Sequence, residues 1–191
     1  MPNTLFINAC VRENSRTLLL AKHLLSKLDG DVLECALGSE GPMPLDAESL
    51  AKRDRCVAAG DYSDPMFRFA HDFAAADRIV IAAPYWDLSV PALLKSYLEN
   101  ITVSGLSFYY DETGVPRSLC RAKQLIYVTT AGGPIFANLG FDYVQCVMRG
   151  FFGIEDCVFF KAENLDIIGA DVEAILQAST QEIDAHFAAR G

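Results

Sequence analysis

Short apolar runs recur along the chain, and segments with helical spacing follow them. The apolar runs occupy residues 5–9, 31–37, 79–83, 124–129 and 156–161. Apolar and polar positions hardly alternate within them, which is typical of strands buried on both faces. Helices are predicted at residues 17–28, 47–59, 66–76, 90–101, 138–152 and 170–189. Five strands that alternate with helices predict an α/β fold with a parallel sheet covered on both faces.

Two further segments have a different character. Residues 38–45 are rich in glycine and proline, which predicts a loop. Residues 106–116 contain alternating aromatic residues and a turn sequence that ends at Gly114, which predicts a small hairpin. No repeat and no low-complexity linker divides the chain, so residues 1–191 are expected to form a single domain.

Length and charge narrow the functional classes. A chain of 191 residues, of which 51% are hydrophobic, is long enough to bury a full core. Its net charge of −9 argues against nucleic acid and against an anionic membrane surface as partners. Residues 1–4 lack a basic region, and no run reaches the ~18 apolar residues of a spanning helix, so neither a targeting segment nor a membrane span is expected.

The six cysteines are scattered through the chain. They are Cys10, Cys35, Cys56, Cys120, Cys146 and Cys157, and no pair has the spacing of a metal site. We therefore expect no bound metal. Reduced and mostly buried thiols in a cytoplasmic protein are the simplest interpretation.

Three predicted loops are expected to meet at one edge of the sheet, because loops after parallel strands emerge at the strands' carboxyl ends. The first, residues 10–17, combines Arg12, Ser15, Arg16 and Thr17 with the start of a helix. Backbone amides at a helix start, hydroxyls and guanidinium groups are suited to hold a phosphate. A simple helix cap at Ser15 is the alternative. No Gly-x-Gly-x-x-Gly fingerprint and no Walker lysine is present, which argues against a nicotinamide-binding Rossmann domain or an ATPase.

The other two loops add flat and small residues. Residues 84–88 place the rings of Tyr85 and Trp86 after a buried strand, although such rings can also merely cap a core. Residues 129–133 contain Gly132 and Gly133, where a backbone can approach a ligand closely or simply turn. Phosphate donors, flat walls and glycines at one edge together favour a phosphorylated planar cofactor.

Several segments resemble a known family. Residues 83–98, Ala-Pro-Tyr-Trp-Asp-Leu-Ser-Val-Pro-Ala-Leu-Leu-Lys-Ser-Tyr-Leu, resemble the Pro-Met-Tyr-Asn-Phe-x-x-Pro-x-x-Leu-Lys-x-Tyr segment of FMN-dependent NADH azoreductases and flavodoxin-like NAD(P)H:quinone oxidoreductases. Residues 105–114, 129–133 and 151–154 are similar to further segments of that family. The resemblance extends from the first strand to about residue 162.

The resemblance implies a flavodoxin-like three-layer fold, with the five strands in the order 2-1-3-4-5. It places an FMN phosphate at Arg12, Ser15, Arg16 and Thr17. It places the flavin ring against Pro84, Tyr85, Trp86, Asp87, Leu88, Thr130, Ala131, Gly132 and Gly133. Tyr110, together with Trp86, would line a substrate pocket and reach across a homodimer.

The implied activity is a two-electron transfer. NADH or NADPH would give a hydride to flavin N5 and leave, and a quinone, an azo compound or a similar acceptor would then take two electrons in a ping-pong sequence. The flavin carries this chemistry, so no catalytic side chain and no metal is implied. The chain departs from the family at Asp87, where the family has an asparagine, and at Cys10, where a serine is common. An ionised Asp87 can only accept hydrogen bonds, and its charge near the ring would disfavour an anionic reduced flavin.

Two other functions remain open at this point. Cys10 and Arg16 satisfy the Cys-x5-Arg spacing of low-molecular-weight tyrosine phosphatases, in which a thiolate attacks a phosphoryl group held by an arginine. The general-acid Asp-Pro-aromatic sequence expected late in such a chain is absent. A flavodoxin-like electron carrier would share the fold and the cofactor but would turn over no small molecule.

Overall fold

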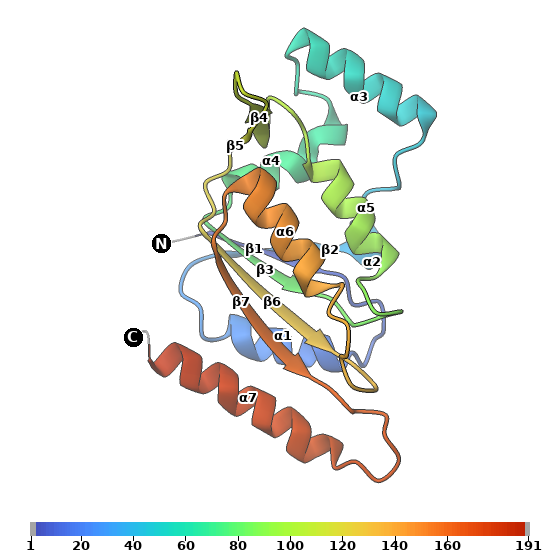
Figure 1. Cartoon of the computed structure of the whole chain (residues 1–191), viewed down its shortest axis with the longest axis vertical. Coiled ribbons are helices and arrows are strands. Elements are labelled where there is room, and N and C mark those ends of the chain that lie inside the picture. The colour runs from blue at the N-terminus through green and yellow to red at the C-terminus, as the bar shows by residue number, and fades with distance from the viewer. Residues whose placement is uncertain (1–2, 190–191) are drawn as a thin grey trace.

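A parallel sheet of five strands lies at the centre of the computed structural model, which describes residues 3–189 (Figure 1). The strands are β1 (Thr4–Asn8), β2 (Val32–Ala36), β3 (Arg78–Ala82), β6 (Gln124–Thr130) and β7 (Asp156–Ala162). They lie in the order β2-β1-β3-β6-β7. This order is the predicted one, because β6 and β7 are the fourth and fifth strands of this sheet along the chain.

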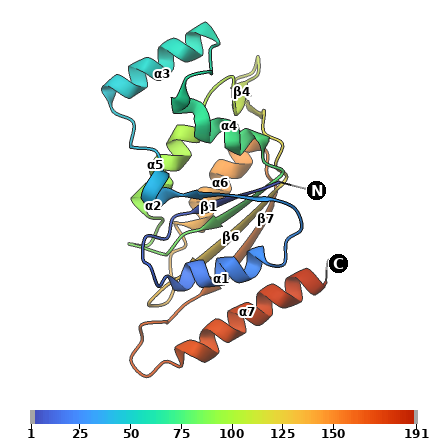
Figure 2. The same ribbon diagram turned by 180° about the vertical axis from the view of Figure 1, so that it is seen from behind.

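Helices cover both faces of the sheet (Figures 1 and 2). On one face lie α1 (Arg16–Leu25) and α7 (Val172–Ala188). The other face carries α4 (Arg68–Ala75), α5 (Ala92–Ile101) and α6 (Phe141–Phe152). The predicted three-layer architecture is therefore confirmed.

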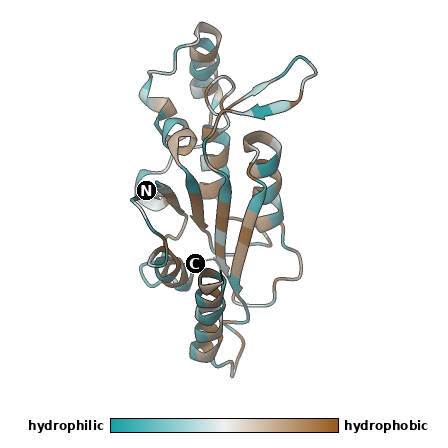
Figure 3. Ribbon diagram, turned by 90° about the vertical axis from the view of Figure 1, so that its left-hand side faces the viewer, coloured by the Kyte–Doolittle hydropathy of each residue, from teal (hydrophilic) through white to brown (hydrophobic). Residues whose placement is uncertain are grey.

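Strands β1, β3, β6 and β7 contribute alternate side chains to two apolar layers, whereas the edge strand β2 contributes only Cys35 and is otherwise largely exposed, so its predicted burial on both faces was wrong. Ile7 and Ile81 point toward α4, α5 and α6, where they pack in one cluster with Phe73. Phe6 and Val80 point the opposite way and join Leu20 of α1 in a second cluster. Figure 3 shows the strands coloured largely as hydrophobic residues, between helices that also carry hydrophilic residues. Burial on both faces explains why the apolar runs lack alternation.

Two segments lie outside these layers. Helix α3 (Ala47–Ala59) has no buried residue and stands away from the sheet (Figure 1). Its start is fixed by a reciprocal capping box between Asp46 and Ser49. Its end is fixed by Gly60 in a left-handed conformation, with φ of 65°. The sequence predicted this polar helix over the same residues.

The predicted hairpin is confirmed as β4 (Phe108–Tyr110) and β5 (Pro116–Ser118), which pair antiparallel. Asp111 closes its turn by accepting hydrogen bonds from the Thr113 hydroxyl, the Val115 amide and the Arg117 side chain. These bonds hold the pKa of the Asp111 carboxyl well below its usual range.

Some predicted boundaries were wrong. Helix α1 ends at Leu25 and not at residue 28, because the amides of Lys27 and Leu28 bond to carbonyls three residues back and tighten the last turn. The predicted loop 38–45 begins with a one-turn helix, α2 (Leu37–Glu40), so the preceding strand ends at residue 36.

Four further helices start later than the sequence predicted, among them α7, which begins at Val172 and not at residue 170. The segment from residue 66 begins as a 3-10 turn, η1 (Pro65–Phe67), and only then becomes α4. Helix α5 starts after Pro91, since a proline favours an extended conformation for the residue before it. Helix α6 starts at Phe141, whose amide bonds to the Asn138 side chain.

None of the helices in residues 3–189 is both long and apolar enough to cross a membrane. The predicted absence of a targeting segment rests partly on Met1 and Pro2, which lie outside the described residues. All six cysteines are free thiols.

Candidate functional site

The loop after β1 is held in place from its first residue. Asn8 ends the strand, and its side-chain oxygen accepts a hydrogen bond from the Cys10 amide at 3.0 Å. Its side-chain nitrogen donates to Glu34 of β2 at 2.8 Å. The loop then runs to Ser15, whose hydroxyl accepts from the Leu18 amide at 3.2 Å and caps α1. Asn8 and Ser15 thus fix both ends of the loop.

The start of α1 offers donors to an anion. The amides of Arg16 and Thr17 belong to the first turn, where the helix itself supplies no acceptor. The positive end of the helix dipole lies at the same place. Thr17 is buried, and its hydroxyl lies 2.6 Å from that of Thr130 at the end of β6. This contact joins the first predicted loop to the third.

The loop after β3 continues the sheet and then turns back sharply. The amides of Ala83 and Tyr85 bond to carbonyls of β6 at 3.1 and 3.0 Å. Trp86 and Ser89 exchange two backbone hydrogen bonds around Asp87 and Leu88, whose φ angles are 50° and 68°. Two central residues with positive φ define a type I′ turn, which ordinarily favours asparagine and glycine. The two hydrogen bonds with Ser89 therefore fix the backbone of Trp86 itself.

The loop after β6 lies against the loop after β7. The carbonyls of Ala131, Gly132 and Gly133 accept hydrogen bonds from the amides of residues 165, 166 and 164, at 3.2, 2.8 and 3.1 Å. Leu165 and Asp166 are thereby brought to the same edge as the three predicted loops. The predicted meeting of loops is confirmed, with a fourth loop added.

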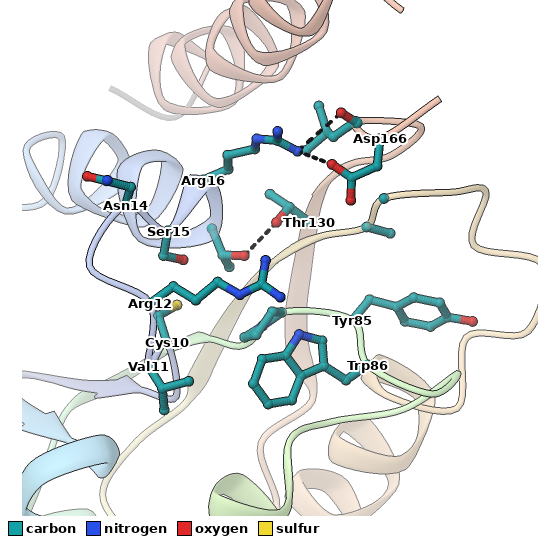
Figure 4. A pocket seen from close by; sticks show the side chains of 15 residues that line it. Cys10, Val11, Arg12, Asn14, Ser15, Arg16, Tyr85, Trp86, Thr130 and Asp166 are labelled. Carbon is teal, nitrogen blue, oxygen red and sulfur yellow. Dashed lines mark hydrogen bonds and ion pairs between the residues drawn. The ribbon is translucent and has the colours of Figure 1, made fainter. Parts of the chain in front are cut away.

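These loops enclose a cavity of about 290 Å³ at the carboxyl ends of the strands (Figure 4). The cavity brings together ten of the predicted residues. They are Arg12, Ser15, Arg16, Thr17, Pro84, Tyr85, Trp86, Thr130, Ala131 and Gly132. Donors of hydrogen bonds lie on its α1 side, and the Trp86 ring lies opposite.

Four predicted residues do not line this cavity. Asp87 and Leu88 form the tip of the tight turn, and Gly133 lies past the rim. Tyr110 is on the exposed hairpin, where its ring packs edge-on against Phe108 and contributes to neither cavity at the turn. The roles that the resemblance gives to these four residues stay predictions.

A second and larger cavity, of about 920 Å³, adjoins the first at Trp86. It lies between the starts of α5 and α6, and most of its lining is apolar. Its lining includes Asp87, Pro91, Leu139 and Tyr143. Because Trp86 lines both cavities, this ring separates a polar compartment from an apolar one.

Cys10 lines the first cavity, but its environment differs from that of a catalytic thiol. Burial raises the pKa of the Cys10 thiol, and the nearby Glu34 carboxylate adds to this effect, against an opposing hydrogen bond with Ser15. The sulfur lies 3.7 Å from the Ala82 carbonyl oxygen, to which the thiol donates. A phosphatase needs a thiolate with a lowered pKa. The geometry therefore disfavours the phosphatase interpretation.

This environment predicts a slow reaction at Cys10. At neutral pH, Cys10 is expected to react with iodoacetamide at least about tenfold more slowly than the thiol of a short, unstructured cysteine peptide. Peptide mass spectrometry after timed alkylation of the protein and the added peptide measures both thiols in one sample. Faster reaction at Cys10 than at the peptide thiol would restore the phosphatase hypothesis.

Sequence reasoning missed Leu165 and Asp166. They follow the fifth strand of the sheet in a segment with no glycine run and no cluster of hydroxyl groups, so composition did not mark them. The rule that loops after parallel strands share an edge could have included them. Among residues 3–189, no group of His, Cys, Asp or Glu side chains has an arrangement that could hold a metal ion.

The strand order and the position of the cavity define a flavodoxin-like protein. A family model described as "flavodoxin-like fold" matches residues 2–187. The chain is 31% identical to an FMN-dependent NADH:quinone oxidoreductase of Caldicellulosiruptor saccharolyticus, over 96% of this chain and 97% of that protein. It is 32% identical to a protein of the same name from Coprothermobacter proteolyticus, with the same coverage of both chains. The chain therefore belongs to the flavodoxin-like family that includes these quinone oxidoreductases.

Solved structures support the same fold. An azoreductase from Bacillus anthracis superposes with a TM-score of 0.82 over 98% of this chain and 99% of that chain, at 22% sequence identity. A second B. anthracis structure, an FMN-dependent NADH-azoreductase in complex with FMN, gives a TM-score of 0.80 at 21% identity, over 97% and 98% of the two chains.

Proposed function

We propose that this protein is an FMN-dependent NADH:quinone oxidoreductase, formed by one domain that spans the chain. The relatives that match it over nearly their whole length carry this name. Within the structure, one observation supports it above the others. The cavity at the carboxyl ends of the strands has the start of α1 on one side and the Trp86 indole ring on the other, and the Arg12 guanidinium extends into the space between them.

The residues present fit FMN. The amides at the start of α1, the Ser15 and Thr17 hydroxyls and the Arg12 guanidinium form a donor set for a phosphate. Ala131 and Gly132 line the same cavity with little or no side chain. The cavity lies just below the ~300–1,000 Å³ typical of small-molecule sites and adjoins the larger one.

Bound FMN would supply the redox chemistry, accepting a hydride from NADH or NADPH and passing two electrons to a quinone or azo acceptor. The chain's own residues would bind and orient it. The Tyr85 hydroxyl donates to the Ala137 carbonyl at 2.7 Å, which ties the loop after β3 to the loop after β6. Trp86 would keep water from one side of the ring, and no side chain is required as nucleophile or general base.

Steady-state turnover tests this function. Under anaerobic conditions, the FMN-loaded protein is expected to oxidise more than one equivalent of NADH per flavin only when a soluble quinone is present, with NADH and NADPH compared at equal concentration. A protein that binds FMN but catalyses no quinone reduction would be an electron carrier. A protein that binds no FMN at all would contradict the proposal.

A homodimer is part of the proposal. The apolar cavity between α5 and α6 offers a surface for a second copy, and Tyr110, which is 55% exposed, lies outside the cavities of its own protomer. A monomeric mass in analytical ultracentrifugation would contradict this assembly. The cytoplasmic location expected from the cysteines stays a prediction.

A further inference from the structure

The Arg16 side chain points out of the phosphate end of the cavity, toward the loop after β7. Its Nη1 atom donates to the Asp166 carboxylate at 2.7 Å and to the Leu165 carbonyl at 3.1 Å (Figure 4). Arg12 behaves differently, because its side chain points into the cavity toward Trp86. The two arginines of the first loop therefore face different partners.

The loop that Arg16 contacts forms part of the cavity wall. Leu165 and Asp166 line the cavity, and their amides bond to the carbonyls of Ala131 and Gly132. Asn164, just before them, turns the chain with a φ of 67°. Arg16 thus joins α1 to a wall built from the loops after β6 and β7.

Gly132 is what allows the Asp166 carboxylate to lie where it does. A Cβ atom on Gly132 would lie 2.3 Å from Asp166 Oδ2, closer than such atoms approach, and 3.2 Å from the Asp166 Cβ, a tight contact. At Gly133 a Cβ atom would meet nothing within 4 Å. The close approach is therefore specific to the glycine that faces Asp166.

We propose that Arg16 and Asp166 form a latch that holds the loop after β7 against the loop after β6 and sets how fast a bound flavin leaves the cavity. Arg16 then serves the latch and not the phosphate, which is left to Arg12 and the start of α1. Asp166 is a positioning residue that acts through Arg16. The part that concerns flavin rests on the proposed function.

The pair is suited to opening. The two side chains are 41% and 67% exposed, and an ion pair in contact with water is weak and screened by salt. Such a pair adds little to global stability, but it can change the population of a locally open loop. Loss of this ion pair is therefore expected to change how often the loop opens and how fast the cofactor leaves.

Amide hydrogen exchange of the flavin-free protein tests the latch itself. Arg16→Met, Asp166→Ala and Gly132→Ala are each expected to speed exchange of the Leu165 and Asp166 amides by about three- to fivefold, the factor that corresponds to a weak ion pair. Gly133→Ala is the matched control and is expected to leave these rates unchanged. Unchanged exchange in Arg16→Met and Asp166→Ala would overturn the proposal.

Flavin release tests the consequence. Dissociation of FMN and of riboflavin, which lacks the phosphate, is followed by the return of flavin fluorescence. Arg16→Met and Asp166→Ala are expected to speed both releases by the same factor of about three to five, and the double variant to exceed neither single variant. A phosphate contact would instead speed only FMN release, as is expected for Arg12→Ala. A faster release of FMN alone in Arg16→Met, or an unchanged release of both flavins, would overturn the latch.

The two proposals can fail separately. If the wild-type protein bound neither flavin, the proposed function would fail, while the amide exchange rates would still decide whether the latch exists.

Discussion

Replacing Arg12 with alanine is expected to weaken FMN binding by about 10- to 100-fold while leaving riboflavin binding unchanged. Arg12 is the arginine of the first loop that points into the cavity, and its guanidinium would meet the phosphate. A hydrogen bond to a charged group contributes roughly 1.5–3 kcal/mol, and each 1.4 kcal/mol is about tenfold in affinity. Fluorescence titration with the two flavins measures the difference.

The matched control is Arg55→Ala. Arg55 is also exposed but lies on α3, the helix that stands away from the sheet. The Arg55→Ala substitution removes the same positive charge far from the cavity. Comparing the two variants therefore separates the loss of a direct contact with FMN from the effect of the protein's net charge. Equal losses of FMN affinity in the two variants, or an equal loss of both flavins in Arg12→Ala, would place the phosphate elsewhere.

Replacing Phe73 with alanine is expected to lower the free energy of unfolding by about 3–5 kcal/mol. Phe73 of α4 is fully buried beneath the sheet, and its ring centre lies 4.7 Å from that of Phe152 on α6. Removing the ring leaves a cavity between two helices that cover the same face. For a chain of this size the melting temperature is expected to fall by about 10 °C.

Phe136→Ala is the control for that variant. Phe136 is 76% exposed, and an exposed substitution of this kind changes stability by no more than about 0.5 kcal/mol. Urea unfolding of both variants gives the comparison directly. A loss at Phe73 as small as that at Phe136 would mean that α4 does not pack on the sheet as described.

The sequence was sufficient for the sheet and for three of the loops around the cavity. Apolar runs such as residues 79–83 identify strands buried on both faces, because burial removes the alternation. Strand order and helix layers then follow from the rules for parallel sheets and from the resemblance. Boundaries were less certain, since Leu25 and Phe141 end or begin helices through local hydrogen bonds that composition does not encode.

The site shows where such reasoning ends. Ser15 and Trp86 could be placed from the pattern alone, because a loop after a buried strand has a known position. The direction in which a side chain points could not be predicted from the pattern. Arg12 and Arg16 lie four residues apart in one loop, yet one points into the cavity and the other bonds to Asp166. Only tertiary contacts with the loop after β7 distinguish them.

The central claim is that this chain binds FMN between α1 and Trp86 and exchanges electrons through it. An anaerobic titration tests it most directly. NADH is expected to bleach the visible absorbance of oxidised flavin in the FMN-loaded protein stoichiometrically, and a quinone added afterwards is expected to restore it. Loss of FMN on gel filtration, or an absorbance that NADH leaves unchanged, would contradict the account.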